Sequence, residues 1–246
     1  IRLWVVFLAG VFSVSLIFLL ASLGFFGALP TFEELENPEK NLATEVISSD
    51  GVTLGKYAFK NRTPVGYSDL SDPLVKALIA TEDERFYDHS GIDFRGTARA
   101  IVKLGKGGGA STITQQLAKN LFTKRASSNT FKRLTQKVKE WIVAIKLERQ
   151  YTKNEIIAMY LNTQEFLFNA IGIRSAARIY FGKEPKDLDI QESAILVAML
   201  KNPRQYNPNR EISKGKSLMR RNGVFAQMAK NEFITQDEKD SLQQLP

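Results

Sequence analysis

Four acidic side chains fall within seven residues of the chain, and Glu82, the first of them, is a candidate general base. The others are Asp83, Glu84 and Asp88, and all four close an apolar segment with helical spacing. This is the C-terminal end of the expected helix, where the helix dipole disfavours negative charge. A carboxylate crowded by others takes up a proton more readily, as a general base must. On spacing alone, a helix end that is acidic without any function is the competing interpretation.

A second candidate carboxylate, Glu140, lies among cations. Lys137 precedes it by three positions, on the same face of a helix, and Lys139 is its direct neighbour. An ordinary helix salt bridge would explain this pattern. The functional interpretation is a carboxylate kept ionised by lysines that bind an anion. Because their surroundings differ in this way, Glu82 and Glu140 are expected to take different roles in one reaction.

Between the two carboxylates, residues 107–120 join a glycine-rich loop to the start of a helix. Ser111 or Thr112 can cap this helix, and free amides at a helix N-terminus bind phosphate. The segment is not a P-loop, because no Gly-Lys-Ser/Thr sequence follows the glycines. Gln116 and Lys119 would lie on one face of the helix. A plain capped helix accounts for the same residues equally well.

The basic residues are concentrated in one segment of the chain. Ten of them, against two acidic residues, lie between Lys119 and Lys153, and this excess equals the formal net charge of the whole chain, +8. A solvated helix face or contact with anionic lipid is one explanation. The other is an anion site. For a domain that lies at the outer side of a membrane, a phosphorylated lipid is the natural anionic ligand. We expect no nucleic acid partner there.

Composition excludes several kinds of site. The chain has no cysteine and a single histidine, His89. Disulfides, thiol nucleophiles, Cys-ligated zinc and three-His metal centres are therefore ruled out. A catalytic triad would have to include His89.

Helices are expected to position most of these residues. Asp72-Pro73 predicts a helix start, as an N-cap followed by proline at the first helical position. Three capping-box pairs predict further starts: Thr152 with Glu155, Asp189 with Glu192, and Thr235 with Glu238. Apolar spacing predicts helices over residues 94–104, from the glycine-rich loop to about residue 122, and over residues 130–150.

Ahead of these helices we expect a transmembrane helix and a small β hairpin. Leu3–Leu29 is a run of 27 residues without a charged, histidine or amide side chain. As a helix it would exceed the ~30 Å bilayer core, and it is too long for the ~7–15-residue apolar region of a signal peptide. Arg2 before the run and acidic residues beyond it favour a cytoplasmic N-terminus. The hairpin is predicted from two strands, residues 43–48 and 52–59, around Ser49-Asp50-Gly51.

Taken together, the motifs resemble the peptidoglycan glycosyltransferase domain (glycosyltransferase family 51) of class A penicillin-binding proteins and monofunctional glycosyltransferases. The family's Glu-Asp-x-x-Phe-x-x-His-x-Gly motif is matched by residues 82–91, and its Gly-x-Ser-Thr-Ile-Thr-Gln-Gln-Leu-x-Lys-Asn motif by residues 109–120. Lys-x-x-Glu is matched at residues 137–140 and a helix ending Tyr-Leu-Asn at residues 153–162. A later Ala-Ala-x-x-Tyr-Phe-Gly-Lys motif is present at residues 176–183.

Two positions depart from the family pattern. Gln136 stands where the family usually has arginine, which makes Arg133, one turn earlier, a candidate substitute in diphosphate binding. Leu167 follows Phe166 where the family usually has glycine, so the loop after residue 162 is expected to differ in shape.

The resemblance implies a mainly α, lysozyme-like, two-lobed domain with a small β hairpin over residues 43–210. A transmembrane anchor, residues 1–29, and a stalk, residues 30–42, would precede it. Residues 211–246 would be helices that connect to a transpeptidase domain. The expected location is the bacterial inner or plasma membrane, with a single pass and the catalytic domain on the outer, periplasmic side.

The resemblance also implies a reaction. The growing glycan would be transferred from undecaprenyl diphosphate onto the 4-hydroxyl of lipid II with inversion, giving β-1,4-linked glycan. Glu82 is then the general base, and Glu140 lies beside the donor diphosphate. Substrate would be bound by polar side chains of the second and third motifs: Ser111, Thr112, Gln115, Gln116, Lys119, Asn120, Arg133, Lys137 and Lys139.

Cofactor and partner expectations follow from the same substrates. No cofactor is required by the sequence, but Mg²⁺ or another divalent cation could bridge Glu140 and the diphosphate. The expected partners are lipid II, the growing strand, membrane lipids and moenomycin-type inhibitors, and other cell-wall synthesis proteins are compatible with them. Two alternatives stay open: a muramidase or lytic transglycosylase that cuts glycan, and a non-catalytic scaffold that binds lipid II.

Overall fold

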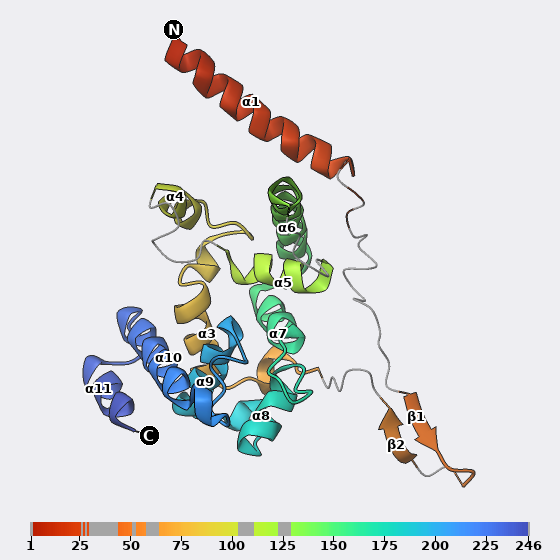
Figure 1. The fold of residues 1–246 in the computed structure, drawn as a ribbon, viewed down its shortest axis with the longest axis vertical. Helices are drawn as coiled ribbons and strands as arrows, with labels where there is room; N and C mark the ends of the chain where they lie inside the picture. Colours follow the sequence, from red (N-terminus) through yellow and green to blue (C-terminus); the bar gives the residue numbers. More distant parts are fainter. Residues whose placement is uncertain are drawn as a thin grey trace.

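The computed structural model of the chain describes residues 2–25, 27, 29, 44–50, 53–57, 64–102, 111–122 and 129–245. Helices dominate this part (Figure 1), which confirms the mainly helical prediction. The α-helices are α1 (Arg2–Ser22), α3 (Asp72–Glu82), α4 (Phe94–Val102), α5 (Ile113–Phe122), α6 (Thr130–Gln150), α7 (Lys153–Thr163), α8 (Ile173–Phe181), α9 (Ile190–Lys201), α10 (Glu211–Lys230) and α11 (Gln236–Gln244). The short 3₁₀ helices are η1 (Tyr67–Asp69), η2 (Phe86–Asp88) and η3 (Pro185–Asp187).

Two groups of helices make up the helical body. In one, α3, α9 and α10 pack on one another, and in the other α5 packs on both α6 and α7 (Figure 1). Apolar side chains from both groups belong to one buried core, among them Leu78 of α3, Leu117 of α5 and Phe225 of α10. Polar contacts of Glu82 and Asp83 with Gln116 and Ile113 then join the C-terminal end of α3 to the start of α5, and with them the first two sequence motifs.

Helix starts follow local sequence closely. All three predicted capping boxes are present: Thr152 with Glu155 at α7, Asp189 with Glu192 at α9, and Thr235 with Glu238 at α11. At α3 the prediction is wrong by one residue, because the N-cap is Ser71, whose side chain accepts the N–H of Leu74. Pro73 then takes the second helical position, where its missing N–H is equally harmless.

The N-terminal helix α1 ends earlier than the apolar sequence does. Gly24 adopts a left-handed conformation (φ 80°), and the N–H groups of Gly24 and Phe25 bond back to Ala21 and Leu20. This is a Schellman closure, which stops the helix at a glycine. In the described residues we find no helix with the length and hydropathy needed to cross a bilayer. The predicted transmembrane helix over Leu3–Leu29 is therefore not confirmed.

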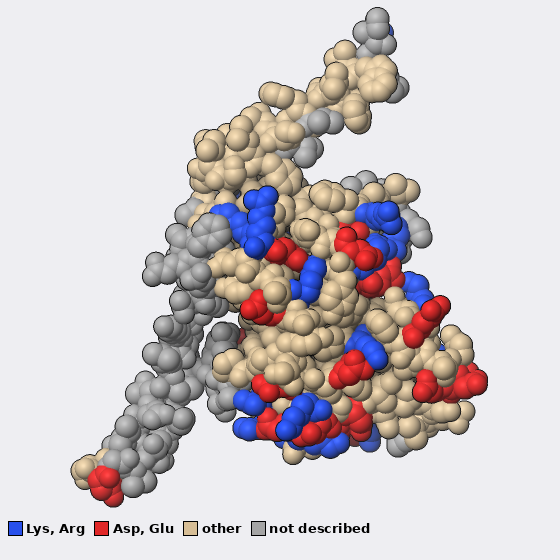
Figure 2. Space-filling view, turned by 180° about the vertical axis from the view of Figure 1, so that it is seen from behind, with Lys and Arg blue, Asp and Glu red and all other residues tan. Residues whose placement is uncertain are grey.

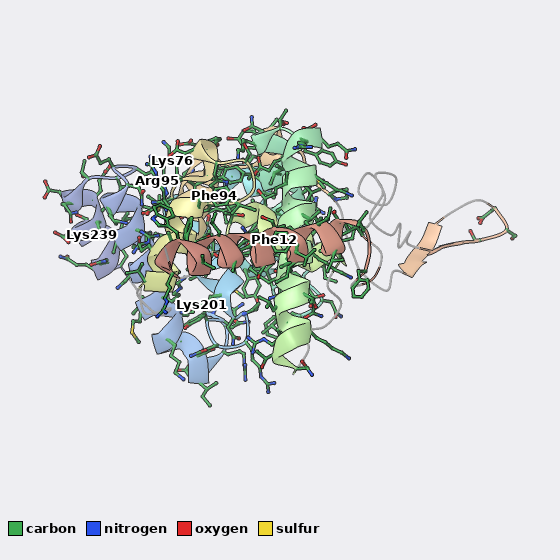
Figure 3. The ribbon with its side chains drawn as sticks, turned by 90° about the horizontal axis from the view of Figure 1, so that it is seen from above. Phe12, Lys76, Phe94, Arg95, Lys201 and Lys239 are labelled. Carbon is green, nitrogen blue, oxygen red and sulfur yellow. The ribbon has the colours of Figure 1, made fainter. Side chains whose placement is uncertain are left out.

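The helix α1 lies across α6 and projects beyond the helical body (Figures 2 and 3). Figure 2 shows it as a tan arm with hardly a charged side chain, and many of its apolar side chains are exposed, including Phe12 at 69%. The two helices meet where the ring of Phe18 lies 5.9 Å from that of Trp141. The α1 segment thus ends next to the helix that carries Glu140.

Two short strands lie apart from the helical body (Figure 1). Strands β1 (Thr44–Ile47) and β2 (Thr53–Tyr57) pair antiparallel, with Thr44 opposite Tyr57 and an irregularity after Val46. The pair occupies the segment in which the hairpin was expected. Of the other expectations, the stalk at residues 30–42 and the glycine-rich loop at residues 105–110 lie outside the described residues.

Candidate active site

Glu82 is the last residue of α3, and its carboxylate is held by a neutral amide. Gln116, in the first half of α5, donates from Nε2 to Glu82 Oε2 at 2.9 Å. The other end of the same amide, Oε1, accepts the hydroxyl of Tyr160 of α7 at 3.0 Å. Side chains of three helices therefore form one row of hydrogen bonds that ends at this carboxylate. Burial, with the charge of Glu82 added to it, raises the pKa of Tyr160 well above its usual value, so its hydroxyl stays protonated.

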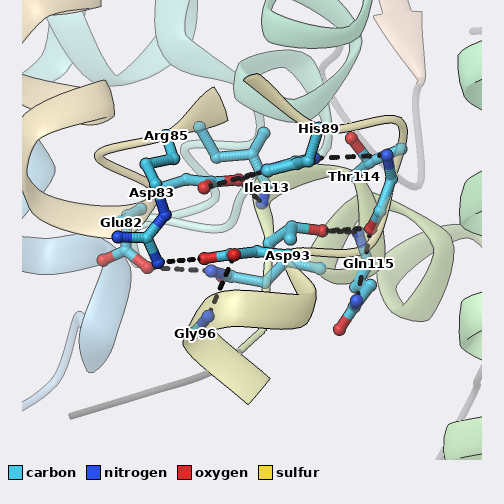
Figure 4. A network of polar contacts seen from close by, with 12 residues as sticks. Glu82, Asp83, Arg85, His89, Asp93, Gly96, Ile113, Thr114 and Gln115 are labelled. Atoms are coloured by element: carbon cyan, nitrogen blue, oxygen red, sulfur yellow. Dashed lines mark hydrogen bonds and ion pairs between the residues drawn. The ribbon is translucent and has the colours of Figure 1, made fainter. Parts of the chain in front are cut away.

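Asp83, the next residue, is turned away and does structural work (Figure 4). Its carboxylate accepts the N–H of Ile113 at 3.0 Å, at the start of α5. The same carboxylate lies 3.1 Å from Nε2 of His89, whose Nδ1 accepts the N–H of Gly91. Nε2 must therefore carry the ring hydrogen and donate a hydrogen bond to the carboxylate of Asp83. The single histidine is thus a support for the end of α3 and for the start of α5.

Of the other two acids of the cluster, Asp88 is exposed and Glu84 is paired elsewhere. Glu84 contacts Lys230 at the end of α10 at 2.6 Å and Arg99 of α4 at 3.4 Å. The hydrogen bond from Lys230 keeps the pKa of Glu84 below its usual value, against the opposing effect of partial burial. Arg85 is bound to Asp93. The like-charge crowding that the sequence suggested around Glu82 is therefore not what surrounds it.

The Glu84–Lys230 pair gives a pH-dependent contribution to stability. Because the pKa of Glu84 is lowered in the folded chain, the contribution is present above the unfolded value near 4.5 and is lost as the pH falls through the folded value. We expect Lys230→Met to lower the free energy of unfolding by ~0.2–1 kcal/mol at neutral pH, since Lys230 is exposed. The loss should vanish once the pH is well below the folded pKa of Glu84, and also in a Glu84→Gln background, as measured by thermal unfolding. A loss that persists in either case would contradict this prediction.

A second polar cluster brings Glu140 together with Lys137 and Ser111. Lys137 Nζ lies 3.3 Å from Glu140 Oε2 and donates to the hydroxyl of Ser111 at 2.9 Å. Glu140 is 8% exposed, and Lys137 is partly exposed. An ammonium held between a buried carboxylate and a hydroxyl, and still open to solvent, can take a further anionic oxygen as a third acceptor. This arrangement joins the second and third sequence motifs in space.

Two of the predicted substrate residues, Thr112 and Gln115, are buried and act on the backbone. Thr112 donates to the carbonyl of Gly91 at 2.7 Å and accepts the N–H of Gln115, so it is Thr112 that caps α5. Gln115 donates to the same carbonyl at 3.2 Å. Gly91 itself has φ 90°, and a Cβ there would lie 3.0 Å from the backbone of Ala144 in α6. These contacts clamp the first motif between α5 and α6.

The other predicted residues lie further out. Lys119, Asn120 and Arg133 are exposed side chains on α5 and α6. Lys139 points toward the end of α1, where a Cβ on Gly27 would be 2.9 Å from its Nζ. Of the lysines proposed from sequence, Lys137 is the one placed at the Glu140 cluster.

The loop after α7 has an unusual backbone at the position where the sequence departs from the family pattern. Leu167, Phe168 and Asn169 all have left-handed φ values, 66°, 52° and 58°. Leucine pays a steric cost in this conformation that glycine does not. The turn is closed by Ala170 and Phe166, whose N–H groups bond to Leu167 and Ala170. A left-handed backbone at Leu167 explains why glycine would suit this position.

The candidate site offers few side chains that could bind a metal ion. The described residues contain no cluster of three or more histidine, cysteine or acidic side chains arranged to hold a metal ion. Glu140 contributes a single carboxylate, and Lys137 already lies against it.

Sequence reasoning missed the part that Tyr160 plays at this site. Tyr160 lies in the Tyr-Leu-Asn end of the helix over residues 153–162, and it is 1% exposed. The feature that could have indicated this role is a tyrosine among the apolar core positions of a helix, because a buried tyrosine hydroxyl usually requires a hydrogen-bond partner. Which partner it finds depends on how α7 packs on α5.

Comparisons with known proteins agree on one family. A family model described as Transglycosylase matches residues 50–229. Penicillin-binding protein 1A of Escherichia coli (strain K12) is 37% identical over 216 residues, which cover 86% of this chain and 25% of that protein. Penicillin-binding protein 1F of Bacillus subtilis (strain 168) is 38% identical over 200 residues, covering 80% of this chain and 27% of that protein.

A solved structure is also similar. The crystal structure of penicillin-binding protein 1A from Haemophilus influenzae aligns with a TM-score of 0.46 and 22% identity, covering 85% of this chain and 21% of that one. The chain spans about a quarter of the length of the curated relatives that it matches.

Proposed function

Because this chain belongs to the transglycosylase family, we propose that it polymerises peptidoglycan. In this proposal the growing glycan is transferred from its undecaprenyl diphosphate onto the 4-hydroxyl of lipid II, with inversion, to make a β-1,4-linked strand. The observation that supports it best is the contrast between two carboxylates. Glu82 faces the neutral amide of Gln116, whereas Glu140 faces the ammonium of Lys137.

Each carboxylate suits one half of the transfer. Glu82 takes the proton of the acceptor hydroxyl as that oxygen forms its bond to the donor sugar carbon. The bond from this carbon to the diphosphate breaks, and its electron pair leaves with the diphosphate. Lys137, steadied by Glu140 and Ser111, offsets the charge that develops on the leaving group. Diphosphate is a good leaving group, so this charge stabilisation matters more than protonation.

A divalent cation is an optional part of the proposal. Glu140 supplies one hard oxygen ligand of the kind that Mg²⁺ prefers, so an ion there would take most of its ligands from the diphosphate and water. The proposed transfer itself proceeds through side chains alone.

Membrane attachment through the N-terminal segment also belongs to the proposal. A lipid-linked substrate requires the site to work at a membrane surface, and α1 exposes an apolar surface next to α6. Its exposed apolar side chains include Trp4, Val5, Phe7, Leu8, Phe12, Leu16 and Leu19. Attachment by a single crossing, with the domain on the outer side, stays a prediction from the residues that flank this segment.

The decisive experiment incubates the purified chain with labelled lipid II, with and without Mg²⁺, and with preformed glycan in parallel. We expect lipid II to be lengthened and diphosphate to be released. Shortening of preformed glycan would instead support a muramidase or lytic transglycosylase, and binding of lipid II without turnover would support a scaffold. Either result would overturn the proposed polymerase. A rate that requires Mg²⁺ would add the ion to the mechanism.

A further inference from the structure

Tyr160 places a hydroxyl group inside the site, although the other buried positions of its helix are apolar. Its hydroxyl donates to Gln116 Oε1 at 3.0 Å, and Gln116 Nε2 donates to Glu82 Oε2 at 2.9 Å. The three side chains come from α7, α5 and α3, and they are 44 and 34 positions apart in sequence. They form one hydrogen-bonded chain that ends on Glu82.

Which group donates in each of these two hydrogen bonds follows from the hydrogen atoms that each group carries. An ionised carboxylate only accepts, so Gln116 must turn its NH₂ end toward Glu82 and its oxygen toward Tyr160. Tyr160 must then donate. Burial and the charge of Glu82 keep its hydroxyl protonated, because both raise the pKa of Tyr160. Tyr160 therefore favours one of the two orientations of the amide.

We propose that Tyr160 is a positioning residue for the general base, because it locks the Gln116 amide with its NH₂ group toward Glu82. The proposal rests on the proposed function, in which Glu82 is that base. Without the hydroxyl, the oxygen end of the amide loses its donor and the two orientations become closer in energy. In the reversed orientation the amide oxygen would face the carboxylate and repel it, so Glu82 would leave its working position more often.

Kinetics test the proposal through Tyr160→Phe, which removes the hydroxyl and keeps the ring. We expect kcat for lipid II polymerisation to fall about three- to tenfold, the range that one neutral hydrogen bond supplies. KM should stay unchanged, because Tyr160 is only 1% exposed. Tyr180→Phe is the matched control, since it removes a hydroxyl of α8 that donates to the carbonyl of Phe166 in the preceding loop at 2.6 Å. It should lower the melting temperature without lowering kcat.

A double-mutant cycle separates positioning from a general loss of packing. If Tyr160 acts through Gln116, then Tyr160→Phe should not lower kcat further in a Gln116→Ala chain. An equal proportional loss of kcat in both backgrounds would overturn the proposal. So would an unchanged kcat in the Tyr160→Phe chain when Glu82→Gln abolishes polymerisation.

A second readout does not depend on activity. NMR spectra are recorded of the protein labelled with ¹⁵N-glutamine. The side-chain amide resonances of Gln116 are identified as those that are missing from the spectrum of the Gln116→Ala variant. We expect them to shift in Glu82→Gln and to shift or broaden in Tyr160→Phe, with no change in Tyr180→Phe. Resonances identical to the wild type in Tyr160→Phe would overturn the positioning role. If Tyr160→Phe does not fold, the Glu82→Gln variant still provides a test, because the Gln116 amide resonances should shift relative to the wild type. Unchanged resonances in Glu82→Gln would overturn the proposed series of hydrogen bonds from Tyr160 to Glu82.

The outcomes also separate this inference from the proposed function. If the wild-type chain does not lengthen lipid II, the proposed function fails, and the amide resonances still show whether Tyr160 orients Gln116. If the wild type polymerises but Tyr160→Phe behaves as Tyr180→Phe does, only the positioning role fails.

Discussion

Glu82→Gln should reduce polymerisation of lipid II by ~10²–10⁴-fold, the range associated with loss of a general base. Glutamine keeps the shape of the side chain and still offers an oxygen to Gln116 Nε2, so the contacts between α3 and α5 should persist. What it cannot do is accept a proton. The loss should therefore appear in turnover, whereas affinity for a moenomycin-type inhibitor should largely survive.

Two matched variants make this result specific. Glu84→Gln removes a carboxylate two positions away that is paired with Lys230, and it should leave turnover close to the wild-type value. Glu140→Gln should disturb inhibitor binding as well as turnover, because it loosens Lys137 at the anion site. Turnover and inhibitor affinity are measured for all three variants. Substantial polymerisation by Glu82→Gln would overturn the assignment of the base and with it the mechanism.

Lys137→Ala should weaken both lipid II turnover and inhibitor binding by about tenfold or more. A hydrogen bond from a charged group contributes about 1.5–3 kcal/mol, and ~1.4 kcal/mol corresponds to a factor of ten. The structure strengthens this expectation, because Lys137 is held by Ser111 at 2.9 Å and by Glu140 at 3.3 Å. Its ammonium is thus already oriented before a diphosphate arrives.

Variants of two other lysines show whether the loss of inhibitor affinity depends on the position of Lys137 or only on its positive charge. Lys132→Ala removes the same charge from an exposed position of the same helix and should change inhibitor affinity little. Lys119→Ala tests the sequence prediction that this exposed lysine also binds the diphosphate, and it should then show a similar loss. If inhibitor affinity is unchanged in both Lys137→Ala and Lys119→Ala, the anion site lies elsewhere.

Features that depend on residues a few positions apart could be predicted from sequence. The three capping boxes formed as expected, because each needs only a side chain and an N–H group three residues away. The one-residue error at Ser71 has the same local character, since proline is tolerated at either of the first two helical positions. The contact between Lys137 and Glu140 has the same local origin, because residues three positions apart lie on one face of a helix.

The end of α1 shows that hydropathy alone does not predict where a helix ends. An apolar run of 27 residues predicted a continuous helix, but two glycines lie in its last third. Gly24 adopts a left-handed backbone and closes α1 at Ser22. Hydropathy counts side chains and does not weigh the backbone freedom that lets a glycine end a helix.

The sequence by itself determined the residue types of the site, the family resemblance and the helices that carry them. Only the tertiary structure decided where neighbouring side chains point. Glu82, Asp83 and Glu84 are consecutive, yet they turn to Gln116 of α5, to the start of α5 and to Lys230 of α10. Adjacent residues at a helix end point in different directions, and the partner of each is set by which distant helix the core packs against that side. For this reason an acidic cluster in the sequence became three separate contacts, and a buried tyrosine came to lie next to the candidate base.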